Sequence, residues 1–369
     1  MQPNVFALIT GGGTSGHVLP AVAIADALVQ GGHRPDEIVY VGAKRGIETR
    51  LVPPTGYPHH FLDVTGLQRK ITAKNLTFPF KMVAAIRRAQ AIVRATRPAV
   101  VVSVGGYASF PATFAARLAR IPIVVVSYDR TPGLASRVSA KFATTCAVAF
   151  AGSSLPRARF TGAPVRSELI QMDRVRDRAA ARVALGVPHD RFLIAVFGGS
   201  LGSQVLNQAI AGVCSALGSR SDLAIRHVVG ERFLDQSGTA LDGTTGMMYN
   251  VIGYESQMPQ VYAAADLMIT RAGAGTIAEL STVGMPAIII PWLGAAENHQ
   301  TANAQVLGGV GAAVVVSEAD LSPERLTNEI TRLIDQPEQL HELASMAYAA
   351  GEAHRSGRLI ALIEEVAAQ

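Results

Sequence analysis

The sequence predicts an α/β protein built from two Rossmann-like, doubly wound domains that face each other across a cleft. Apolar segments with the length of buried strands alternate along the chain with segments of helical spacing, an order that produces parallel sheets covered by helices. The two halves also begin alike, because a glycine-rich turn follows a strand at 12–16 and again at 198–202. Ligands of such domains bind at the carboxyl ends of the strands, so these turns are candidate sites.

Length and composition fit two domains with large cores. The chain has 369 residues, of which 49% are hydrophobic and 17% are charged, so disorder is not expected. The first strand starts without a basic leader, and no uninterrupted apolar run reaches membrane-spanning length. We therefore expect a protein that is kept in the cytoplasm. The net charge of +5 suits anionic ligands or an anionic membrane surface, and we expect no nucleic-acid partner.

The boundary between the two halves is marked by glycine and proline in a linker-like stretch around Ala163-Pro164. We therefore place the first domain at 1–163 and the second at 164–345, and we expect a helical segment at 346–369 to pack back on the first. We interpret Cys146 and Cys214 as buried thiols rather than a disulfide. The predicted strands are VFALIT, EIVYVG, AVVVSV, IPIVVVS and TTCAVAF in the first half and FLIAVFGG, LAIRHVVG, DLMITR, MPAIIIP and AAVVVS in the second.

The first glycine loop joins a strand to a helix within residues 5–28. Backbone N–H groups and the helix dipole at such a turn favour a phosphate or another developing anion. The loop is not the dinucleotide fingerprint, and no Walker lysine follows either glycine turn. His17 stands where the loop becomes a helix, so a neutral imidazole there can accept a proton from a hydroxyl nucleophile. The alternative is a histidine that only hydrogen-bonds a neighbouring loop.

A third glycine loop, at 271–280, also precedes a helix. Glu279 lies in the first part of that helix, where its carboxylate can accept hydrogen bonds from the vicinal hydroxyls of a ribose. The alternative is a first-turn glutamate that only favours the helix dipole. His299 and Gln300 follow the next strand. Their polar groups suit sugar hydroxyls, and the alternative for them is a surface loop.

The sequence offers no recognisable metal site. It contains no Asp-x-Asp pair of the kind that holds a donor diphosphate through a metal, and no His or Cys cluster with zinc spacing. We therefore predict neither a metal nor another cofactor. A leaving group would then be stabilised by amides, helix dipoles and side chains.

The segment 67–90 combines cations with apolar side chains and contains no acidic residue. Such a surface suits an anionic bilayer, because its headgroups attract cations while apolar groups enter the interface. The alternative is that the apolar residues face the core and leave the cations as a solvated face. The residues that we assign to a membrane contact are Lys70, Lys74, Phe78, Phe80 and Lys81.

Six motifs together resemble the MurG family, the UDP-N-acetylglucosamine:lipid I N-acetylglucosaminyltransferases of peptidoglycan synthesis. The resemblance implies the GT-B fold and two substrates, UDP-GlcNAc and membrane-bound lipid I. It also implies inverting, metal-independent transfer of GlcNAc to the 4-hydroxyl of the MurNAc sugar, giving lipid II, by a peripheral protein on the anionic cytoplasmic face of the cell membrane. The motifs are GGGTSGHVLPAVAIADAL, VVSVGGYASFPATFAA, TGAPVRSEL, FGGSLGSQVLN, RAGAGTIAEL and ENHQTANAQVL.

The same resemblance implies roles for individual residues. Thr14, Ser15 and Gly16 would lie against the sugar-phosphate of the donor. His17 would lie near the acceptor as the catalytic base, and Asp129, at a later strand end, is the other candidate for that role. The remaining donor contacts implied are Arg166, Ser200 on the diphosphate, Ala274, Gly275 and Thr276 on phosphate, Glu279 on the ribose, His299 and Gln300 at the sugar, and Glu255 at the position near the uracil.

Other functions stay open at this point. One is a GT-B glycosyltransferase with another acceptor, such as a glycolipid or a natural product. Another is a non-hydrolysing UDP-GlcNAc 2-epimerase, an isomerase of the same fold that needs no lipid acceptor, so the basic and apolar segment at 67–88 argues against it. The chain has Ser15 where the family has glycine, and Val126-Ser127 where the family has His-Glu. It also has Glu255 where the family has an apolar residue, and His299-Gln300 where the family has a glutamine pair. These departures also leave a divergent paralogue open. A further alternative is a catalytically inactive subunit that only binds a nucleotide sugar, against which the intact His17 and Glu279 argue weakly.

Overall fold

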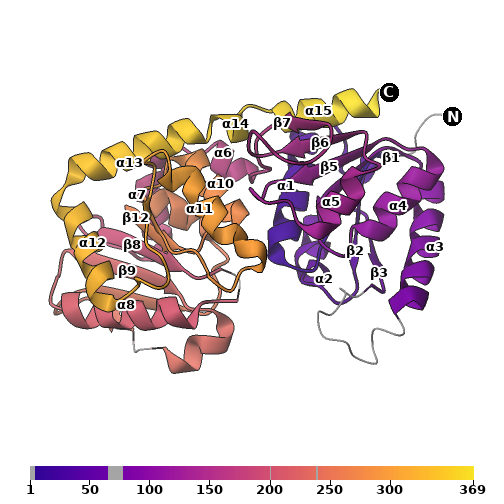
Figure 1. Cartoon of the computed structure of the whole chain (residues 1–369). Coiled ribbons are helices and arrows are strands. Elements are labelled where there is room, and N and C mark those ends of the chain that lie inside the picture. The colour runs from indigo at the N-terminus through magenta and orange to yellow at the C-terminus, as the bar shows by residue number, and fades with distance from the viewer. Residues whose placement is uncertain (1–4, 65–77, 200, 238–239) are drawn as a thin grey trace. The chain divides into compact units, whose positions relative to one another are not determined.

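The computed structural model describes residues 5–64, 78–199, 201–237 and 240–369. The chain forms two compact units, one made of Met1–Ser167 with Ala353–Gln369 and the other of Glu168–Glu352 (Figure 1). Each unit contains a seven-stranded sheet with helices packed on it. The predicted class, two doubly wound α/β domains, is confirmed.

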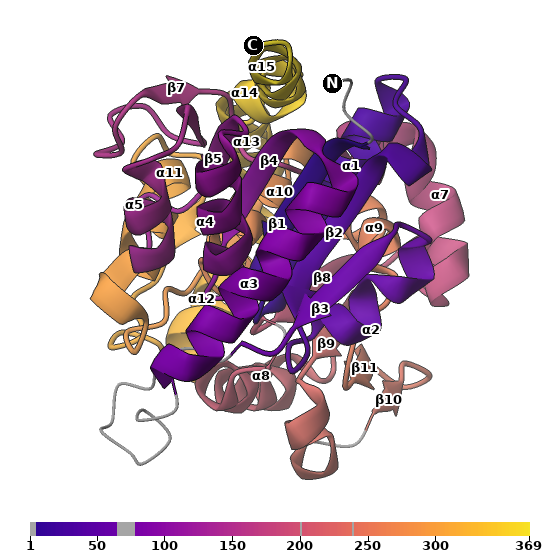
Figure 2. The ribbon, with the colours of Figure 1, turned by 90° about the vertical axis from the view of Figure 1, so that its right-hand side faces the viewer.

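The sheet of the first unit has the strand order β3-β2-β1-β4-β5-β6-β7, and all of its pairings are parallel. Helices α3, α4 and α5 cover one face of this sheet (Figure 2). Its elements are β1 (Val5–Gly11), α1 (Ser15–Gln30), β2 (Ile38–Ala43), α2 (Glu48–Leu51), β3 (His59–Leu62), α3 (Phe78–Thr96), β4 (Pro98–Gly105), α4 (Phe110–Ala119), β5 (Ile123–Ser127), α5 (Leu134–Ala140), β6 (Thr145–Val148) and β7 (Ala158–Phe160).

The sheet of the second unit has the order β10-β11-β9-β8-β12-β13-β14, and only β10 is antiparallel to its neighbour among the described strands. The helix α8 packs against α12, and α10 packs against α11 and α13. Its elements, with the two short helices at the unit boundaries, are α6 (Ser167–Ile170), α7 (Arg174–Leu185), β8 (Phe192–Phe197), α8 (Gln204–Leu217), β9 (Leu223–Val228), β10 (Leu241–Asp242), β11 (Met248–Ile252), α9 (Met258–Ala264), β12 (Leu267–Thr270), α10 (Ala274–Val283), β13 (Ala287–Ile289), α11 (His299–Gly308), β14 (Val314–Val315), α12 (Pro323–Asp335), α13 (Pro337–Ala350) and α14 (Glu352–Arg355).

Each unit has a core of branched aliphatic side chains from the central strands. Leu8 and Val101 are fully buried in the first unit, as Ile194 and Ile269 are in the second. Because both faces of these parallel sheets are covered, the central strands read as continuous apolar runs rather than as alternating patterns. This explains why the strands could be located from the sequence.

Helix starts follow the local sequence. Ser322 followed by Pro323 is typical of a helix start, and α12 begins there with the Ser322 hydroxyl accepting a hydrogen bond from the Arg325 N–H at 3.0 Å. Pro79 stands in the first turn of α3, so the Phe78-Pro79-Phe80 stretch opens this helix. Both cysteines are free, as predicted, but Cys214 is only partly buried.

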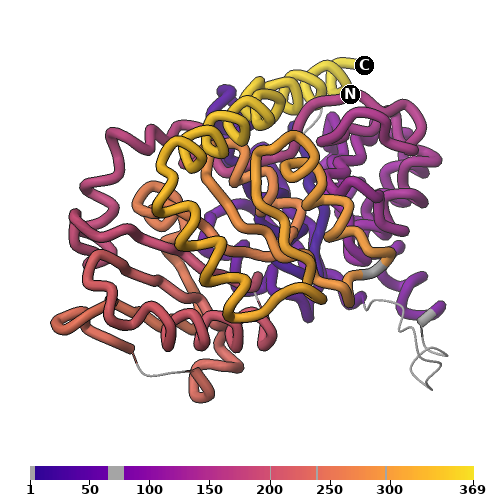
Figure 3. The backbone as a smooth tube through the Cα atoms, turned by 60° about the vertical axis from the view of Figure 1, so that its left-hand side comes forward, coloured from indigo at the N-terminus to yellow at the C-terminus, as the bar shows by residue number. Residues whose placement is uncertain are grey.

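The last helix, α15 (Arg358–Ala367), returns to the first unit, where it packs against α1, β4 and β5 (yellow in Figure 3). The Arg159 guanidinium lies 2.6 Å from the Glu365 carboxylate. The Ala163 N–H donates to Nδ1 of the buried His354 at 2.9 Å. The first unit is therefore assembled from two distant parts of the chain.

Candidate active site

The first glycine loop holds His17 in a fixed orientation. His17 lies in the first turn of α1, and its Nδ1 is 3.1 Å from the Thr14 hydroxyl oxygen. The opposite edge of the ring packs against Gly105, where an added Cβ would come within 3.1 Å of the imidazole Cδ2. In the tautomer whose Nδ1–H donates to the Thr14 hydroxyl oxygen, Nε2 is the nitrogen that can accept a proton.

His17 and Asp129 meet at one cavity of about 190 Å³ in the first unit. The lining also includes Ser127, Tyr128 and Ser136, so β5, the loop after it and the start of α5 form the wall opposite α1. Burial lowers the pKa of His17, while the negative charges of Asp129 and Glu48 oppose that shift. The imidazole is therefore neutral at neutral pH, and the nearby carboxylates stabilise it once it takes a proton.

Tyr128 fixes the start of α1 from the other side of this cavity. Its hydroxyl donates a hydrogen bond to the Gly16 carbonyl, and its side chain is buried. Burial and then the charge of Asp129 raise the pKa of Tyr128 well above its usual value, so the phenol stays protonated and keeps donating. Tyr128 stands in the segment where the sequence departs from the family pattern, and its contact braces the residue next to His17.

The glycine turns at 12–16 and 105–107 interlock. Gly106 has a φ of +78°, and a Cβ on it would collide with the Gly12 carbonyl oxygen. Gly13 has a φ of +95°, and a Cβ on it would come within 2.5 Å of the Tyr107 ring. Glycine is required at both positions by the backbone conformation and by the close approach.

Glu48 is a member of this site that the sequence reasoning missed. Its carboxylate is fully buried and accepts hydrogen bonds from the Gly13 N–H at 3.1 Å to each oxygen and from the Ala43 N–H at 2.8 Å. The Gly13 amide, expected to bind a ligand anion, is therefore occupied by an internal carboxylate. The two glycines near Glu48 in the sequence, Gly42 and Gly46, could have indicated this contact, because a Cβ at either position would crowd the Glu48 side chain.

In the second unit, the glycine turn before α8 is held by an arginine that the sequence reasoning also missed. Arg271 donates to the Ser203 hydroxyl at 2.7 Å and pairs with Glu318 at 2.7 Å. Ser203 in turn caps α8 through the Leu206 N–H. Ser200, the predicted diphosphate ligand, lies outside the described residues, so its role stays a prediction.

The predicted ribose ligand lies on α10. Glu279 is partly exposed there, and its Oε2 accepts a hydrogen bond from the Tyr262 hydroxyl at 3.0 Å. Ala274, Gly275 and Thr276 form the first turn of the same helix, after Gly273. Glu279 and the N–H groups of the first turn therefore come from one rigid element.

The residues predicted for the sugar brace neighbouring strand ends. Gln300 Oε1 accepts hydrogen bonds from the Ala272 N–H at 3.2 Å and the Trp292 N–H at 3.0 Å. His299 is the first residue of α11, directly before Gln300. Gln300 therefore links the loop that leads into α10 to the segment after β13, and the sugar-binding role of both residues stays a prediction.

Two other predicted donor residues have structural contacts. Glu255 is buried, pairs with Arg226 at 2.7 Å and accepts from the Gln257 N–H at 2.8 Å. Its carboxylate is thus compensated inside the unit, and the backbone of its loop is held in place. Arg166 is partly exposed in the segment that leads out of the first unit.

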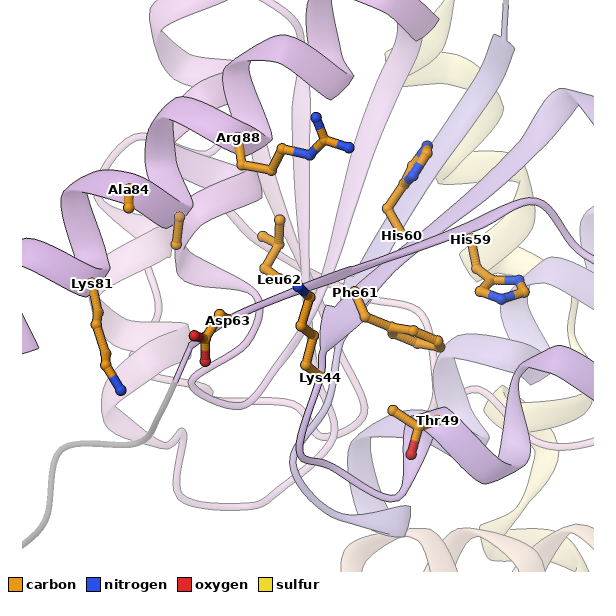
Figure 4. A pocket seen from close by; sticks show the side chains of 11 residues that line it. Lys44, Thr49, His59, His60, Phe61, Leu62, Asp63, Lys81, Ala84 and Arg88 are labelled. Carbon is orange, nitrogen blue, oxygen red and sulfur yellow. The ribbon is translucent and has the colours of Figure 1, made fainter.

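Of the predicted membrane residues, Phe80 and Lys81 can be placed. Phe80 is 80% exposed at the start of α3, and Lys81 lines a larger cavity of the same unit (Figure 4). Lys70 and Lys74 lie outside the described residues, as does the side chain of Phe78. Among the helices that the structure describes, none is both long and apolar enough to cross a membrane.

No metal centre is formed by the residues described. Across residues 5–64, 78–199, 201–237 and 240–369, no three His, Cys, Asp or Glu side chains are grouped so that they could hold a metal ion. The negative charges of Asp129 and Glu48 act on His17, whose pKa they raise against the effect of burial.

Comparison with known proteins places the chain in a family. The model of the glycosyltransferase family 28 N-terminal domain matches residues 7–148, and that of the family 28 C-terminal domain matches residues 193–358. A UDP-N-acetylglucosamine–N-acetylmuramyl-(pentapeptide) pyrophosphoryl-undecaprenol N-acetylglucosamine transferase from Paenarthrobacter aurescens (strain TC1) is 39% identical over 97% of this chain and 95% of its own. The protein of the same name from Mycobacterium sp. (strain JLS) is 36% identical over 95% of this chain and 93% of its own.

Solved structures agree with this assignment. MurG of Acinetobacter baumannii is similar over 100% of both chains, with a TM-score of 0.72 and 26% identity. A UDP-GlcNAc 2-epimerase from Neisseria meningitidis has a TM-score of 0.65 over 98% of this chain and 99% of its own, but at 12% identity that likeness concerns the fold alone. The chain therefore has the GT-B fold and belongs to the MurG family of N-acetylglucosaminyltransferases, within glycosyltransferase family 28.

Proposed function

We propose that the protein transfers GlcNAc from UDP-GlcNAc to the 4-hydroxyl of MurNAc in lipid I, forming lipid II and UDP. The observation that carries the proposal is the cavity that His17 and Asp129 both line, where the lowered pKa of His17 keeps its imidazole neutral. Such a pair can take a proton from a hydroxyl and stabilise the resulting cation. The relatives named for this transfer support the choice of substrates.

In this reaction His17 accepts the proton of the acceptor hydroxyl through Nε2 while Thr14 holds Nδ1. The hydroxyl oxygen attacks C1 of GlcNAc from the face opposite the UDP group, so a single displacement inverts that carbon. The C1–O bond to UDP breaks, and the electron pair leaves with the diphosphate. General-base assistance of this kind contributes about 10²–10⁴-fold to the rate.

The second unit supplies the donor site in this proposal. The first turn of α10 presents backbone N–H groups that suit the diphosphate, and Glu279 suits the ribose hydroxyls. Tyr262 fixes the Glu279 carboxylate through one oxygen, which orients it in advance of binding. Since the sequence has no Asp-x-Asp pair, we propose that these groups stabilise the leaving UDP without a metal ion.

The acceptor lies in a membrane, and we propose that the protein works as a peripheral protein on the anionic cytoplasmic face of the cell membrane. The exposed ring of Phe80 next to Lys81 supports this, because an apolar group flanked by a cation suits the bilayer interface. The measurement is sedimentation with anionic or neutral vesicles at low and high salt. Binding should need anionic lipid and fall with salt, and equal binding to neutral vesicles would contradict the electrostatic part.

The proposed reaction is tested by incubating the purified protein with labelled UDP-GlcNAc and a lipid I analogue. The expected product is a labelled disaccharide-lipid whose new linkage is β, as judged by proton NMR coupling. EDTA should leave at least part of the activity. A product of free ManNAc nucleotide would instead indicate the epimerase, and labelling only of unrelated acceptors would indicate another transferase. Complete loss with EDTA and recovery with magnesium or manganese would refute metal independence.

A further inference from the structure

The loop at 290–294, which follows β13 in the second unit, carries the only tryptophan of the chain. Trp292 is 49% exposed, and its neighbour Leu293 is 56% exposed. A single apolar side chain at the surface needs no explanation. An indole and an adjacent leucine on a loop that is held rigidly indicate a contact surface, so the backbone of this loop decides between the two cases.

Side chains from three other segments hold the backbone of the loop. Gln300 Oε1 accepts a hydrogen bond from the Trp292 N–H at 3.0 Å, and Glu318 Oε2 accepts one from the Leu293 N–H at 2.9 Å. Arg271 donates to the carbonyl oxygens of the two preceding residues at 3.2 Å and 3.4 Å. Four consecutive residues therefore each have a backbone group fixed by a side chain, and two of these side chains are charged, which strengthens their hydrogen bonds.

The indole is supported by the loop that carries it. A Cβ added to Gly294 would lie 2.8 Å from Cε2, 2.8 Å from Cζ2 and 2.9 Å from Nε1 of Trp292. The ring therefore packs directly on the backbone of Gly294, where a side chain would displace it, while about half of Trp292 stays exposed. A ring that is already held in place loses little conformational entropy when a ligand covers it.

The same hydrogen bonds connect this loop to the elements of the proposed donor site. The Gln300 oxygen that holds Trp292 also accepts a hydrogen bond from the Ala272 N–H at 3.2 Å, in the loop that leads into α10. Arg271 also donates to Ser203, which caps α8, at 2.7 Å. Because its oxygen is engaged twice, the amide nitrogen is the part of Gln300 that can donate to a ligand hydroxyl.

We propose that Trp292 is the stacking surface for the sugar ring of the nucleotide-sugar donor. The hydroxyls of a GlcNAc ring are equatorial, so C–H groups point outward from its faces. An indole can cover such a face without leaving a hydroxyl unsatisfied, while Gln300 donates at the edge of the ring. This inference rests on the proposed function. It adds a residue that favours UDP-GlcNAc over the product UDP, because transfer of the sugar removes the contact.

Tryptophan fluorescence reports on Trp292 alone, because the chain has no other tryptophan. The first arm measures quenching of the emission by acrylamide for the protein alone, with saturating UDP and with saturating UDP-GlcNAc. A sugar ring over the half-exposed indole should lower the quenching constant about twofold or more, and UDP should leave it unchanged. Equal protection by both nucleotides would assign the contact to the nucleotide and overturn the proposal.

The second arm measures the affinities for UDP-GlcNAc and UDP by calorimetry. Trp292→Ala should weaken UDP-GlcNAc binding about two- to tenfold without changing UDP binding, and Trp292→Phe should retain most of the affinity because it keeps a ring. Gly294→Ala keeps the indole but displaces it, so it should weaken UDP-GlcNAc binding in the same selective way.

Tyr348→Ala is the matched control, because Tyr348 is a 53% exposed aromatic residue on α13 of the same unit, outside the loop. It should leave both affinities unchanged, and far-UV circular dichroism verifies that every variant is folded. UDP-GlcNAc affinity that Trp292→Ala does not change, or protection of the indole only by the lipid I analogue, would overturn the proposal. Wild-type transfer with either of these results would reject this contact alone, whereas wild-type protein that does not bind UDP-GlcNAc would reject the proposed function together with it.

Discussion

Replacement of Glu48 by alanine tests whether an internal carboxylate holds the first glycine loop. The side chain is 0% exposed and satisfies two backbone donors, the N–H groups of Gly13 and Ala43. Truncation leaves the buried Ala43 N–H and the part-buried Gly13 N–H without their acceptor, at a cost of about 1–3 kcal/mol each. We therefore expect a loss of about 2–6 kcal/mol in the free energy of unfolding, a large part of the total stability of a domain.

The assay is urea denaturation followed by circular dichroism, with Glu342→Ala as the matched control. Glu342 is exposed on α13, so its truncation should change the free energy of unfolding by about 0.5 kcal/mol or less. Glu48→Gln adds a finer comparison, because glutamine keeps the shape but offers one acceptor oxygen in place of two. It should fall between wild type and Glu48→Ala. If Glu48→Ala unfolds within about 0.5 kcal/mol of the control, the amide contacts do not matter as argued.

Three further predictions concern the site and its histidines. Glu279→Ala should weaken UDP binding about ten- to a hundredfold, because charged hydrogen bonds are lost. Tyr262→Phe should weaken UDP binding less. If calorimetry finds the same UDP affinity for Glu279→Ala as for wild type, Glu279 has only a structural role. His17→Ala should lower the single-turnover rate about 10²–10⁴-fold with little change in donor affinity. A wild-type rate at saturating substrate would show that His17 is not the base and make Asp129 the candidate. Burial lowers the pKa of His227 and of His354 from 6.5 to about 4, and Arg355 adds to the effect at His354. Below pH 6.5 these histidines therefore become protonated in the unfolded chain but stay neutral in the native state. The free energy of unfolding should fall by about 2 kcal/mol per histidine between pH 7 and pH 5. Urea denaturation at both pH values checks this, and a free energy that does not fall on acidification would contradict it.

The sequence predicted best those elements that depend on residues close together in the chain. Central strands with two covered faces had to be apolar, and their alternation with helices predicted both domains. The cap at Ser322 needed only its own residue and the next three. The edge strand β7 was missed because all three of its residues are exposed, so its pairing with β6 rather than its composition defines it.

Several residues of the site were recognised from sequence because they stand at the ends of strands or the starts of helices. His17 and Asp129 qualified on that ground, and the fold brings both to one cavity. Glu48 could not be found that way, since it reaches a loop 35 positions earlier in the chain. The Arg226–Glu255 pair likewise depends on how two separate segments pack. Such contacts are decided by tertiary structure rather than by spacing.

The return of α15 to the first unit has a consequence for how the protein is made. The ribosome synthesises Glu168–Glu352, a continuous unit, before the segment that completes the first one. Leu362 and Ile363 are buried against the first unit, so that unit has a vacant apolar surface on α1, β4 and β5 until its last helix emerges. The second unit can therefore finish folding first, although it is translated after most of the other, and a nascent chain stopped near residue 352 should expose a site for chaperones on the first unit.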